Sequence, residues 1–290
     1  MNEKFKNQEE QNYLSLLEKV YKVGNKKEDR TGDGTKSLFG ETLRFSLENN
    51  ILPLLTSKKM FFRGIAQELI FFISGNSDTN VLKNQNIHIW DGNTSRSFLD
   101  SRGLTNLPEG DMGLGYGHNW RNFNGTKDKP GIDQLANLLD MLKSEPNSRR
   151  ILMTAWNPSE THLAALPPCH CFIELYVNGD ELSLMWINRS CDLFHGFGFN
   201  LGSYALLTHI LAKASNLRAK EVIFVGGDVH IYNSHLLLAE EQLKRETFPF
   251  PQIKINKDLS SIKDIEGIEF KDLELINYVS GPTIKGSMVI

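Results

Sequence analysis

The stretch at residues 171–187 reads CFIELYVNGDELSLMWI. Two runs rich in β-branched and aromatic residues flank an Asn-Gly pair, the strongest short-range signal for a β-hairpin. We therefore predict strands over 171–177 and 182–187, joined by a tight turn at Asn178-Gly179.

Helical and extended patterns alternate irregularly on both sides of this hairpin. The order mixes hairpins with helices, which favours an α+β domain over a regular doubly wound one. Without a linker or a repeat, we predict a single domain over residues 1–290 with a mixed β-sheet packed by helices. The predicted helices cover 13–23, 61–74, 132–143, 201–216 and 234–246; further strands cover 42–47, 150–156 and 222–225; polar surface insertions cover 91–106 and 122–130; peripheral strands lie within 252–276.

Composition limits the partners and the compartment. The net charge is −3, so no nucleic acid is expected as an obligate partner. The odd count of 3 clustered cysteines argues against a disulfide framework and favours a reducing, cytoplasmic location. Residues 1–7 lack the apolar core of a signal peptide, and no apolar run reaches the ~20 residues that a membrane span needs.

A cysteine follows a rigid Pro-Pro corner in the run LPPCH at residues 166–170. Free cysteine is often only a small buried apolar residue, but polar partners lie nearby in this sequence. A thiol hydrolase needs a histidine in contact with the cysteine. His170 suits Cys169 poorly, because neighbours in an extended chain point to opposite faces. Direct addition of a thiolate, stabilised by Arg189, is the alternative, and the residues alone leave both chemistries open.

Arginines beside turns indicate an anionic substrate. Arg30 lies in a glycine-punctuated loop, Arg149 and Arg150 precede a predicted strand, and Arg189 precedes Ser190. Each alone is usually a solvated surface charge. Together they suit a phosphate dianion, because guanidinium groups bind phosphate in a forked geometry.

Asn200 carries an amide with two possible functions. It could cap a helix that begins near Leu201, or it could donate to a carbonyl and accept from a ring N–H at once. The second pattern matches the O4 and N3–H edge of uracil, whereas cytosine presents the reverse polarity. His230 and Tyr232 share one face of a predicted strand. They are either a half-buried polar strand end or donors to sugar hydroxyls.

Glu68 lies within an apolar predicted helix, where a carboxylate is unexpected unless it has a partner. Burial would raise its pKa and suit it to acid/base catalysis; the alternative is a boundary glutamate whose carboxylate reaches water. Trp90 and Tyr116 are either core residues or the wall of a site for a flat aromatic cofactor. Since no metal-ligand spacing, P-loop or dinucleotide glycine fingerprint occurs, no metal is expected.

Together these motifs resemble the thymidylate synthase family nearly from end to end, and the insertion at 91–111 resembles eukaryotic-type members. The matching segments are 29–32 (DRTG), 53–56 (PLLT), 58–59 (KK), 67–69 (QEL), 89–91 (IWD), 148–151 (SRRI), 155–158 (AWNP), 166–170 (LPPCH), 189–192 (RSCD), 199–200 (FN) and 227–232 (GDVHIY).

The resemblance implies reductive methylation of dUMP to dTMP, with 5,10-methylenetetrahydrofolate as co-substrate and dihydrofolate as the second product. Cys169 would add to C6 of uracil, Asn200 would hold the base edge and Glu68 would manage proton transfers. The implied catalytic residues are Cys169, Glu68, Asn200, Asp192 and Tyr116. The implied dUMP ligands are Arg30, Arg149, Arg150, Arg189, Ser190, Cys191, Asp192, Asn200, His230, Ile231 and Tyr232. The implied folate contacts are Trp90, Ile89, Asp192, Gly196, Phe199 and Val289.

The resemblance also implies a homodimer. Its interface would be the sheet, and Arg149 and Arg150 would reach the partner's site. Val289 and Ile290 match a C-terminal segment that closes over the pocket.

Some residues depart from the family pattern on the folate side. Asn188 replaces a glutamine, His195 a leucine and Gly198 a proline, and Ser280-Gly281 stand where Pro-His is usual. A hydroxymethylase of the same superfamily, in which water finishes the reaction, is therefore the second interpretation. An inactive nucleotide- or RNA-binding regulator is a third, and the intact Cys169 argues against it.

Overall fold

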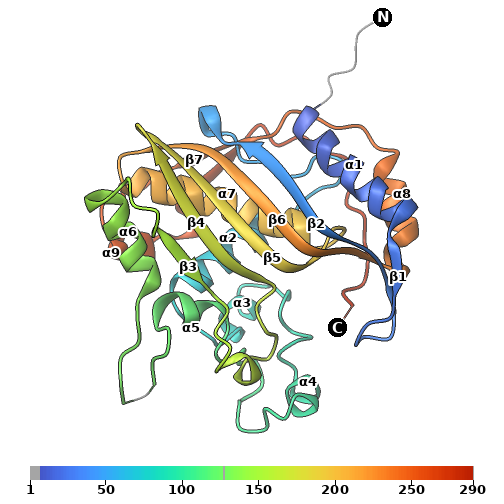
Figure 1. The fold of residues 1–290 in the computed structure, drawn as a ribbon, viewed down its shortest axis with the longest axis horizontal. Helices are drawn as coiled ribbons and strands as arrows, with labels where there is room; N and C mark the ends of the chain where they lie inside the picture. The colour runs from blue at the N-terminus through green and yellow to red at the C-terminus, as the bar shows by residue number, and fades with distance from the viewer. Residues whose placement is uncertain (1–6, 127, 290) are drawn as a thin grey trace, which may run out of the picture.

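The computed structural model describes residues 7–126 and 128–289 (Figure 1). The expectations for residues 1–6 and for Ile290 lie outside these ranges. The helices are α1 Gln8–Val23, α2 Phe62–Ile73, α3 Asn80–Lys83, α4 Arg96–Ser101, α5 Tyr116–Arg121, α6 Gln134–Ser144, α7 Gly196–Ala214, α8 Leu236–Leu243 and α9 Ile262–Glu266. The strands are β1 Asn25–Lys27, β2 Thr35–Ser46, β3 Leu152–Thr154, β4 His170–Asn178, β5 Glu181–Asp192, β6 Arg218–Tyr232, β7 Gln252–Ile255 and β8 Leu273–Ile276. Short 3₁₀ turns occupy η1 Glu48–Asn50, η2 Thr161–Leu163, η3 Asn233–His235 and η4 Phe270–Asp272.

A mixed sheet of six strands organises the chain, in the order β1-β2-β6-β5-β4-β3. β5 and β6 run parallel, and the other neighbours are antiparallel. This confirms the predicted α+β class. The β4–β5 hairpin is confirmed as well, with Gly179 at φ +62° in its turn, a backbone conformation that glycine adopts without strain.

β6 is much longer than the predicted strand at 222–225, because Gly226-Gly227 does not end it. A side chain at Gly227 would place its Cβ 2.8 Å from the carbonyl oxygen of Arg189 on β5. Glycine therefore lets the two parallel strands approach closely where a turn was expected. The strand continues to Tyr232, and this brings His230 alongside Asp192 in the β5–β6 register.

Helix α7 begins at Gly196, five residues before the predicted start at Leu201. The Asp192 carboxylate accepts the backbone N–H groups of Phe194 and His195, at 2.9 and 3.1 Å, and so satisfies donors just ahead of the helix. The helix is buried along most of its length and packs on β5 and β6. It forms the core together with α2, and both lie behind the sheet in Figure 1.

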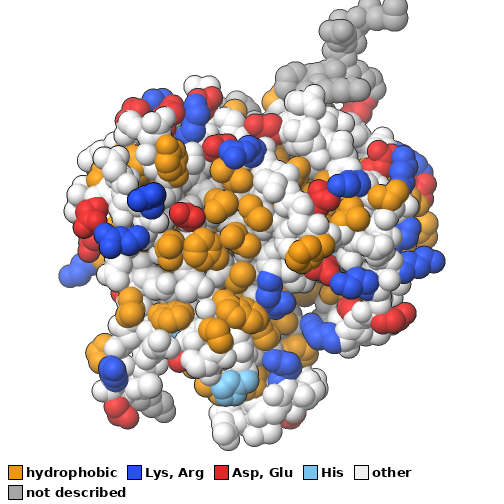
Figure 2. Space-filling view, in the orientation of Figure 1, with side chains coloured by type: hydrophobic (Ala, Val, Ile, Leu, Met, Phe, Trp, Pro, Cys, Tyr) orange, Lys and Arg blue, Asp and Glu red, His pale blue; other side chains and the backbone are white. Residues whose placement is uncertain are grey.

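The opposite face of the sheet has no helix over it (Figure 1). Alternation along the strands directs Tyr176, Met185, Ile187, Ile223 and Val225 to this face. Tyr176 is 66% exposed and the other four side chains are half-buried. Figure 2 shows hydrophobic side chains gathered across the middle of this surface. A contiguous apolar patch of this kind marks an interaction surface.

Glu10 ties α1 to the segment before α2. Its buried carboxylate accepts the backbone N–H of Thr56 at 2.8 Å and that of Ser57 at 2.7 Å. Glu10→Ala would leave these donors buried and unpaired, so we expect the free energy of unfolding to fall by about 3 kcal/mol. Urea denaturation measures this loss. Glu18→Ala, on the exposed side of the same helix, is the control and should change it by less than about 0.5 kcal/mol; equal losses would contradict the assignment.

Candidate active site

Cys169 lies just before β4, in a loop held from two sides. Its backbone N–H donates to the Tyr116 hydroxyl at 2.8 Å, and its carbonyl accepts from the Arg189 backbone N–H at 2.9 Å. The Arg189 side chain donates to the carbonyl oxygens of Pro167 and Pro168, each at 2.9 Å. The Pro-Pro corner therefore fixes both the cysteine and its arginine.

The Arg189 guanidinium lies 3.7 Å from the Cys169 sulfur, as predicted. Burial nevertheless raises the pKa of the Cys169 thiol, and the positive charges of Arg189 and Arg30 offset this only in part. Cations near a thiol favour the thiolate, whereas removal from water disfavours it. In the free protein the balance therefore favours the thiol form of Cys169.

His170 cannot serve as the base for Cys169. Its ring stacks on Tyr116 with centroids 4.0 Å apart, and Nδ1 lies 2.6 Å from the Tyr204 hydroxyl. Burial lowers the pKa of His170 to about 3. In the described part of the chain no histidine forms a hydrogen bond to the Cys169 sulfur, and this removes the support for a thiol hydrolase.

Glu68 lies on α2 and faces the indole ring of Trp90. Its Oε1 accepts the indole N–H of Trp90 at 2.8 Å. Burial raises the pKa of Glu68 to about 7, and the hydrogen bond from Trp90 partly opposes this rise. Tyr116 connects the two reactive groups, because its hydroxyl binds the Cys169 backbone and its ring lies 6.2 Å from that of Trp90. A carboxyl group that titrates near neutrality is suited to both give and take a proton.

The start of α7 forms another wall. Asn200 lies inside the helix and half-buried, so it does not cap the helix and its amide is available for a ligand. Gly198, in the first turn, is packed closely, since a Cβ there would lie 2.7 Å from Leu55 Cδ1 and 3.0 Å from Met60 Cε. The two neighbouring side chains thus fill the space of the proline that is usual in the family.

β6 contributes His230 and Tyr232, whose rings meet edge to face at 5.1 Å. Asp228, two residues earlier, accepts from His230 Nδ1 at 3.2 Å and pairs with Lys27 at 2.8 Å. These partners lower the pKa of Asp228 to about 2, with His230 as the main cause. Burial raises the pKa of Tyr232 to about 12, with smaller effects from Asp192, Asp29, Arg30 and Cys169.

Some predicted site residues have a restricted position. The side chain of Ile231 is fully buried and that of Cys191 is 3% exposed, because both point into the core from their strands. Only their main-chain groups are placed to contact a ligand, so a role of Cys191 and Ile231 in dUMP binding would use the backbone. Arg149 and Arg150 are exposed on the loop before β3, where Arg150 lies 3.7 Å from Glu145. Among the described residues they form no recorded hydrogen bond or ion pair with the Cys169 loop.

The remaining predicted residues differ in their burial and in the space around them. Ile89 and Phe199 are partly buried against the core. Gly196 has open space around it, and the only atom within 4 Å of an added Cβ is Asp192 Cβ, at 3.9 Å. Ser190 and Val289 are half-buried.

Two contacts were missed by the sequence reasoning. Trp156 lies under the Arg189 guanidinium, 5.2 Å from ring centroid to Cζ, and Asp228 orients His230. Trp156 stands in a motif that resembles the family, AWNP, but no local pattern connects it to an arginine 33 positions later. Asp228 sits two residues before His230, and that i, i+2 spacing on a strand was an available signal.

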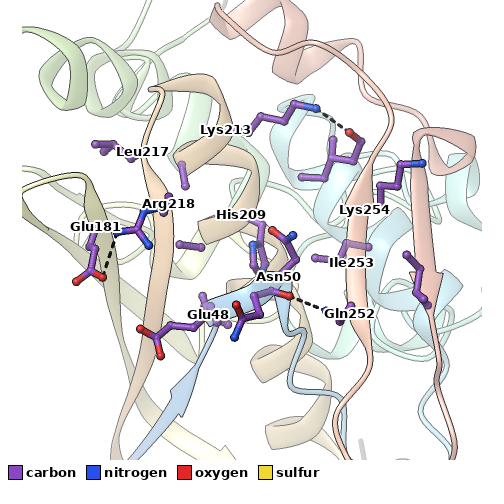
Figure 3. A pocket seen from close by; sticks show the side chains of 16 residues that line it. Glu48, Asn50, Glu181, His209, Lys213, Leu217, Arg218, Gln252, Ile253 and Lys254 are labelled. Atoms are coloured by element: carbon purple, nitrogen blue, oxygen red, sulfur yellow. Dashed lines mark hydrogen bonds and ion pairs between the residues drawn. The ribbon is translucent and has the colours of Figure 1, made fainter.

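A separate groove of about 740 Å³ lies at the far end of the sheet, between η1, the end of α7 and β7 (Figure 3). None of the candidate residues lines it. Its charged side chains have partners within the groove or beside it: Lys213 donates to the Ile255 carbonyl at 2.7 Å, and Arg218 lies 3.5 Å from Glu181. The groove is distinct from the Cys169 pocket.

A cysteine beside an arginine, near a buried carboxyl group with a raised pKa and several aromatic rings, defines a candidate enzyme site. The sequence profile of the thymidylate synthase family matches residues 11–290. The chain belongs to the thymidylate synthase family.

The chain is similar to single-function and fused proteins. It is 42% identical to the thymidylate synthase of Saccharomyces cerevisiae over 98% of both chains. It is 46% identical to the bifunctional dihydrofolate reductase-thymidylate synthase of Leishmania amazonensis, and 43% identical to that of Zea mays. The match covers 98% of this chain but 56% of the Leishmania protein, so the chain spans about half the length of these bifunctional relatives.

Proposed function

We propose that this protein is a thymidylate synthase, a methyltransferase that converts dUMP to dTMP with 5,10-methylenetetrahydrofolate. The observation that carries the proposal is the placement of the Cys169 sulfur 3.7 Å from Arg189, in one pocket with a buried Glu68. A nucleophile beside a cation suits an anionic substrate, and a carboxyl group with its pKa near 7 suits proton transfer.

Binding of dUMP would use charge at one end and hydrogen bonds at the other. Arg30, Arg189 and Ser190 hold the phosphate, and His230 and Tyr232 bind the deoxyribose. Asn200 pairs with the uracil edge. The thiolate of Cys169 adds to C6 and makes C5 nucleophilic. The phosphate is a counter-charge for Arg189, which is held in place by the carbonyl oxygens of Pro167 and Pro168.

The residues on the other side of the pocket fit a flat pterin. Trp90, Tyr116 and Phe199 provide apolar ring surface, and Asp192 provides a carboxylate beside Gly196, where space is open. When bound, the folate supplies the one-carbon unit and then the hydride that completes the methyl group. Glu68 moves protons to and from this side of the substrate, through water. No resident metal takes part in this proposal.

The uncovered face of the sheet supports a homodimer. Its apolar side chains need a cover, and a second copy of the same face would supply it. Arg149 and Arg150 project into solvent on this chain, and in the dimer they reach the partner's phosphate site. The proposal treats residues 1–290 as one catalytic domain. It also places the protein in the cytoplasm, in keeping with cysteines that are all free. None of the described helices is long and apolar enough to span a bilayer.

Val225→Asp tests the dimer, because Val225 lies on β6, in the middle of the uncovered face of the sheet. An aspartate there is solvated in a monomer but buried in the dimer, so we expect a shift from dimer to monomer in sedimentation velocity and a loss of activity. Leu237→Asp is the control: Leu237 is 77% exposed on α8, and that variant should remain dimeric. A wild-type monomer with full activity would contradict the proposal.

The products of the wild-type protein test the reaction itself. With dUMP and 5,10-methylenetetrahydrofolate we expect dTMP and dihydrofolate, identified by mass. Formation of 5-hydroxymethyl-dUMP with tetrahydrofolate would instead establish the hydroxymethylase, for which the changed residues Asn188 and His195 leave room. Absence of any turnover would favour the regulator.

A further inference from the structure

The chain after β8 crosses the molecule without regular secondary structure and is held by separate hydrogen bonds. The Tyr278 hydroxyl donates to the Leu55 carbonyl at 2.7 Å, and the Gly281 N–H donates to the Thr56 carbonyl at 2.7 Å. Closer to the end, His235 Nε2 lies 2.8 Å from the Ser287 carbonyl oxygen. Because a carbonyl oxygen only accepts, Nε2 of His235 carries the hydrogen. In a neutral ring Nδ1 is then a bare acceptor.

A second imidazole lies beside this contact. The rings of His195 and His235 are 4.7 Å apart between centroids. Gly286 packs directly on the first ring, since a Cβ there would lie 2.9 Å from His195 Nε2. Nε2 of His195 and Nδ1 of His235 are both buried, and neither has a hydrogen-bond partner among the described residues. The rings of His195 and His235 therefore support the C-terminal segment, and they do so at His195, the residue that precedes α7.

The surroundings of the His195 ring disfavour, on balance, the addition of a proton. Asp192, Lys58 and His235 face His195, and the Tyr232 ring faces His235 at 6.0 Å. Lys58 donates to the Phe194 carbonyl and lies over the Phe194 ring. The single carboxylate already accepts two backbone N–H groups. Burial lowers the pKa of His195, as do the charges of His235 and Lys58, whereas Asp192 and the backbone of Gly286 raise it; the net direction is downward.

We propose that His195 is a positioning residue that, packed against His235, seats the C-terminal segment at the start of α7 while the His195 ring is neutral, and that proton uptake by His195 releases the segment. This inference rests on the proposed function in one respect: the contact of the C-terminal segment with His195 and His235, called the seat below, lies on the proposed folate side of the active site. Gly286 packs on His195, the residue before Gly196, so release of the segment would weaken folate binding more than dUMP binding.

The direction of the pH effect follows from linkage. Because the pKa of His195 is lowered in the seated state, seating is favoured at pH values above the ordinary histidine pKa of 6.5. This preference is lost as the pH falls below 6.5. One proton gives at most about a tenfold change per pH unit. We therefore expect the seated fraction to fall severalfold on acidification, and the KM for the folate to rise in parallel.

Hydrogen–deuterium exchange of peptides from residues 277–289, read as protection relative to the free peptide, tests the seat at about pH 7.5 and about pH 5.5. The wild type should lose protection there at the lower pH. His195→Leu removes the titrating ring but keeps apolar volume, so its change in protection with pH should be less than about twofold. His162→Leu, an exposed histidine on η2, is the control and should behave as wild type. Folate KM, dUMP KM and kcat at both pH values provide the second readout.

The outcomes separate this proposal from the proposed function. Equal protection at both pH values in the wild type, or the same loss in His195→Leu, would overturn the seat even if the protein makes dTMP. A pH-dependent seat that His195→Leu abolishes, in a protein without dTMP formation, would keep the seat and overturn the function. A change confined to kcat would also count against a positioning role for His195.

Discussion

Cys169→Ala is expected to lower the rate of dTMP formation by about 10⁴-fold or more, the scale of losing a covalent nucleophile. The substitution removes only the sulfur. The loop should keep its position, because Tyr116 and Arg189 hold it through the Cys169 main chain, at 2.8 and 2.9 Å. Binding of dUMP, measured by calorimetry, should therefore survive while turnover disappears.

Cys171→Ala provides the matched control. Cys171 is half-buried two residues further on, and its sulfur lies 3.6 Å from the Ile187 carbonyl oxygen. This variant should retain turnover within about threefold, since no proposed step uses its thiol. A 5-fluorinated dUMP analogue with the folate should add its mass to wild type and Cys171→Ala but not to Cys169→Ala. Retained turnover in Cys169→Ala would remove the cysteine from the reaction.

The sequence predicts best what depends on neighbouring residues. The Asn178-Gly179 turn determines a hairpin locally, and the apolar spacing of residues 61–74 becomes α2 almost unchanged. The start of α7 and the length of β6 were predicted wrongly, because both depend on tertiary contacts. The first depends on the carboxylate of Asp192 and the second on the close approach of Gly227 to Arg189.

The candidate site likewise combines features that the local sequence indicates with features that depend on tertiary contacts. The sequence identified Cys169 and Glu68 as candidate residues, but it did not predict their connection through Tyr116, because the Tyr116 hydroxyl meets a backbone group 53 residues away. The expectation of a cation-stabilised thiolate was incomplete for a similar reason. Arg189 lies beside Cys169, yet burial raises the pKa of the Cys169 thiol by more than the charge of Arg189 lowers it. The burial of a single atom cannot be derived from the spacing of residues in the sequence.

Glu68→Gln is the second variant with a large expected effect. The amide keeps the shape and can still accept from the Trp90 indole, but it cannot exchange a proton. We expect kcat to fall by about 10²- to 10⁴-fold, while dUMP binding and the Cys169 adduct remain. The limb of the kcat–pH profile near pH 7 should vanish, because the pKa of Glu68 is raised to about 7.

Stability gives a readout of Glu68 that needs no substrate. Its pKa is 4.5 in the ordinary state and about 7 in the fold, so the folded state holds its proton more tightly. The contribution of Glu68 to the stability of the wild type is therefore largest below pH 4.5, and it is lost as the pH rises through about 7. The loss is on the order of 3 kcal/mol. Glu68→Gln lacks this loss, so the difference in unfolding free energy between the two proteins should shift in favour of the variant between acidic pH and about pH 8.

Trp90→Phe decides whether Glu68 is the group that titrates. The Trp90 N–H stabilises the carboxylate, and its loss should raise the pKa of Glu68 further. The limb of the kcat–pH profile should then move to higher pH in Trp90→Phe. If the indole only filled space, its removal would instead admit water, and the limb would move to lower pH. Since hydration would lower the pKa, a shift to lower pH would show that solvent access governs this carboxyl group. An unmoved limb would assign it to another residue.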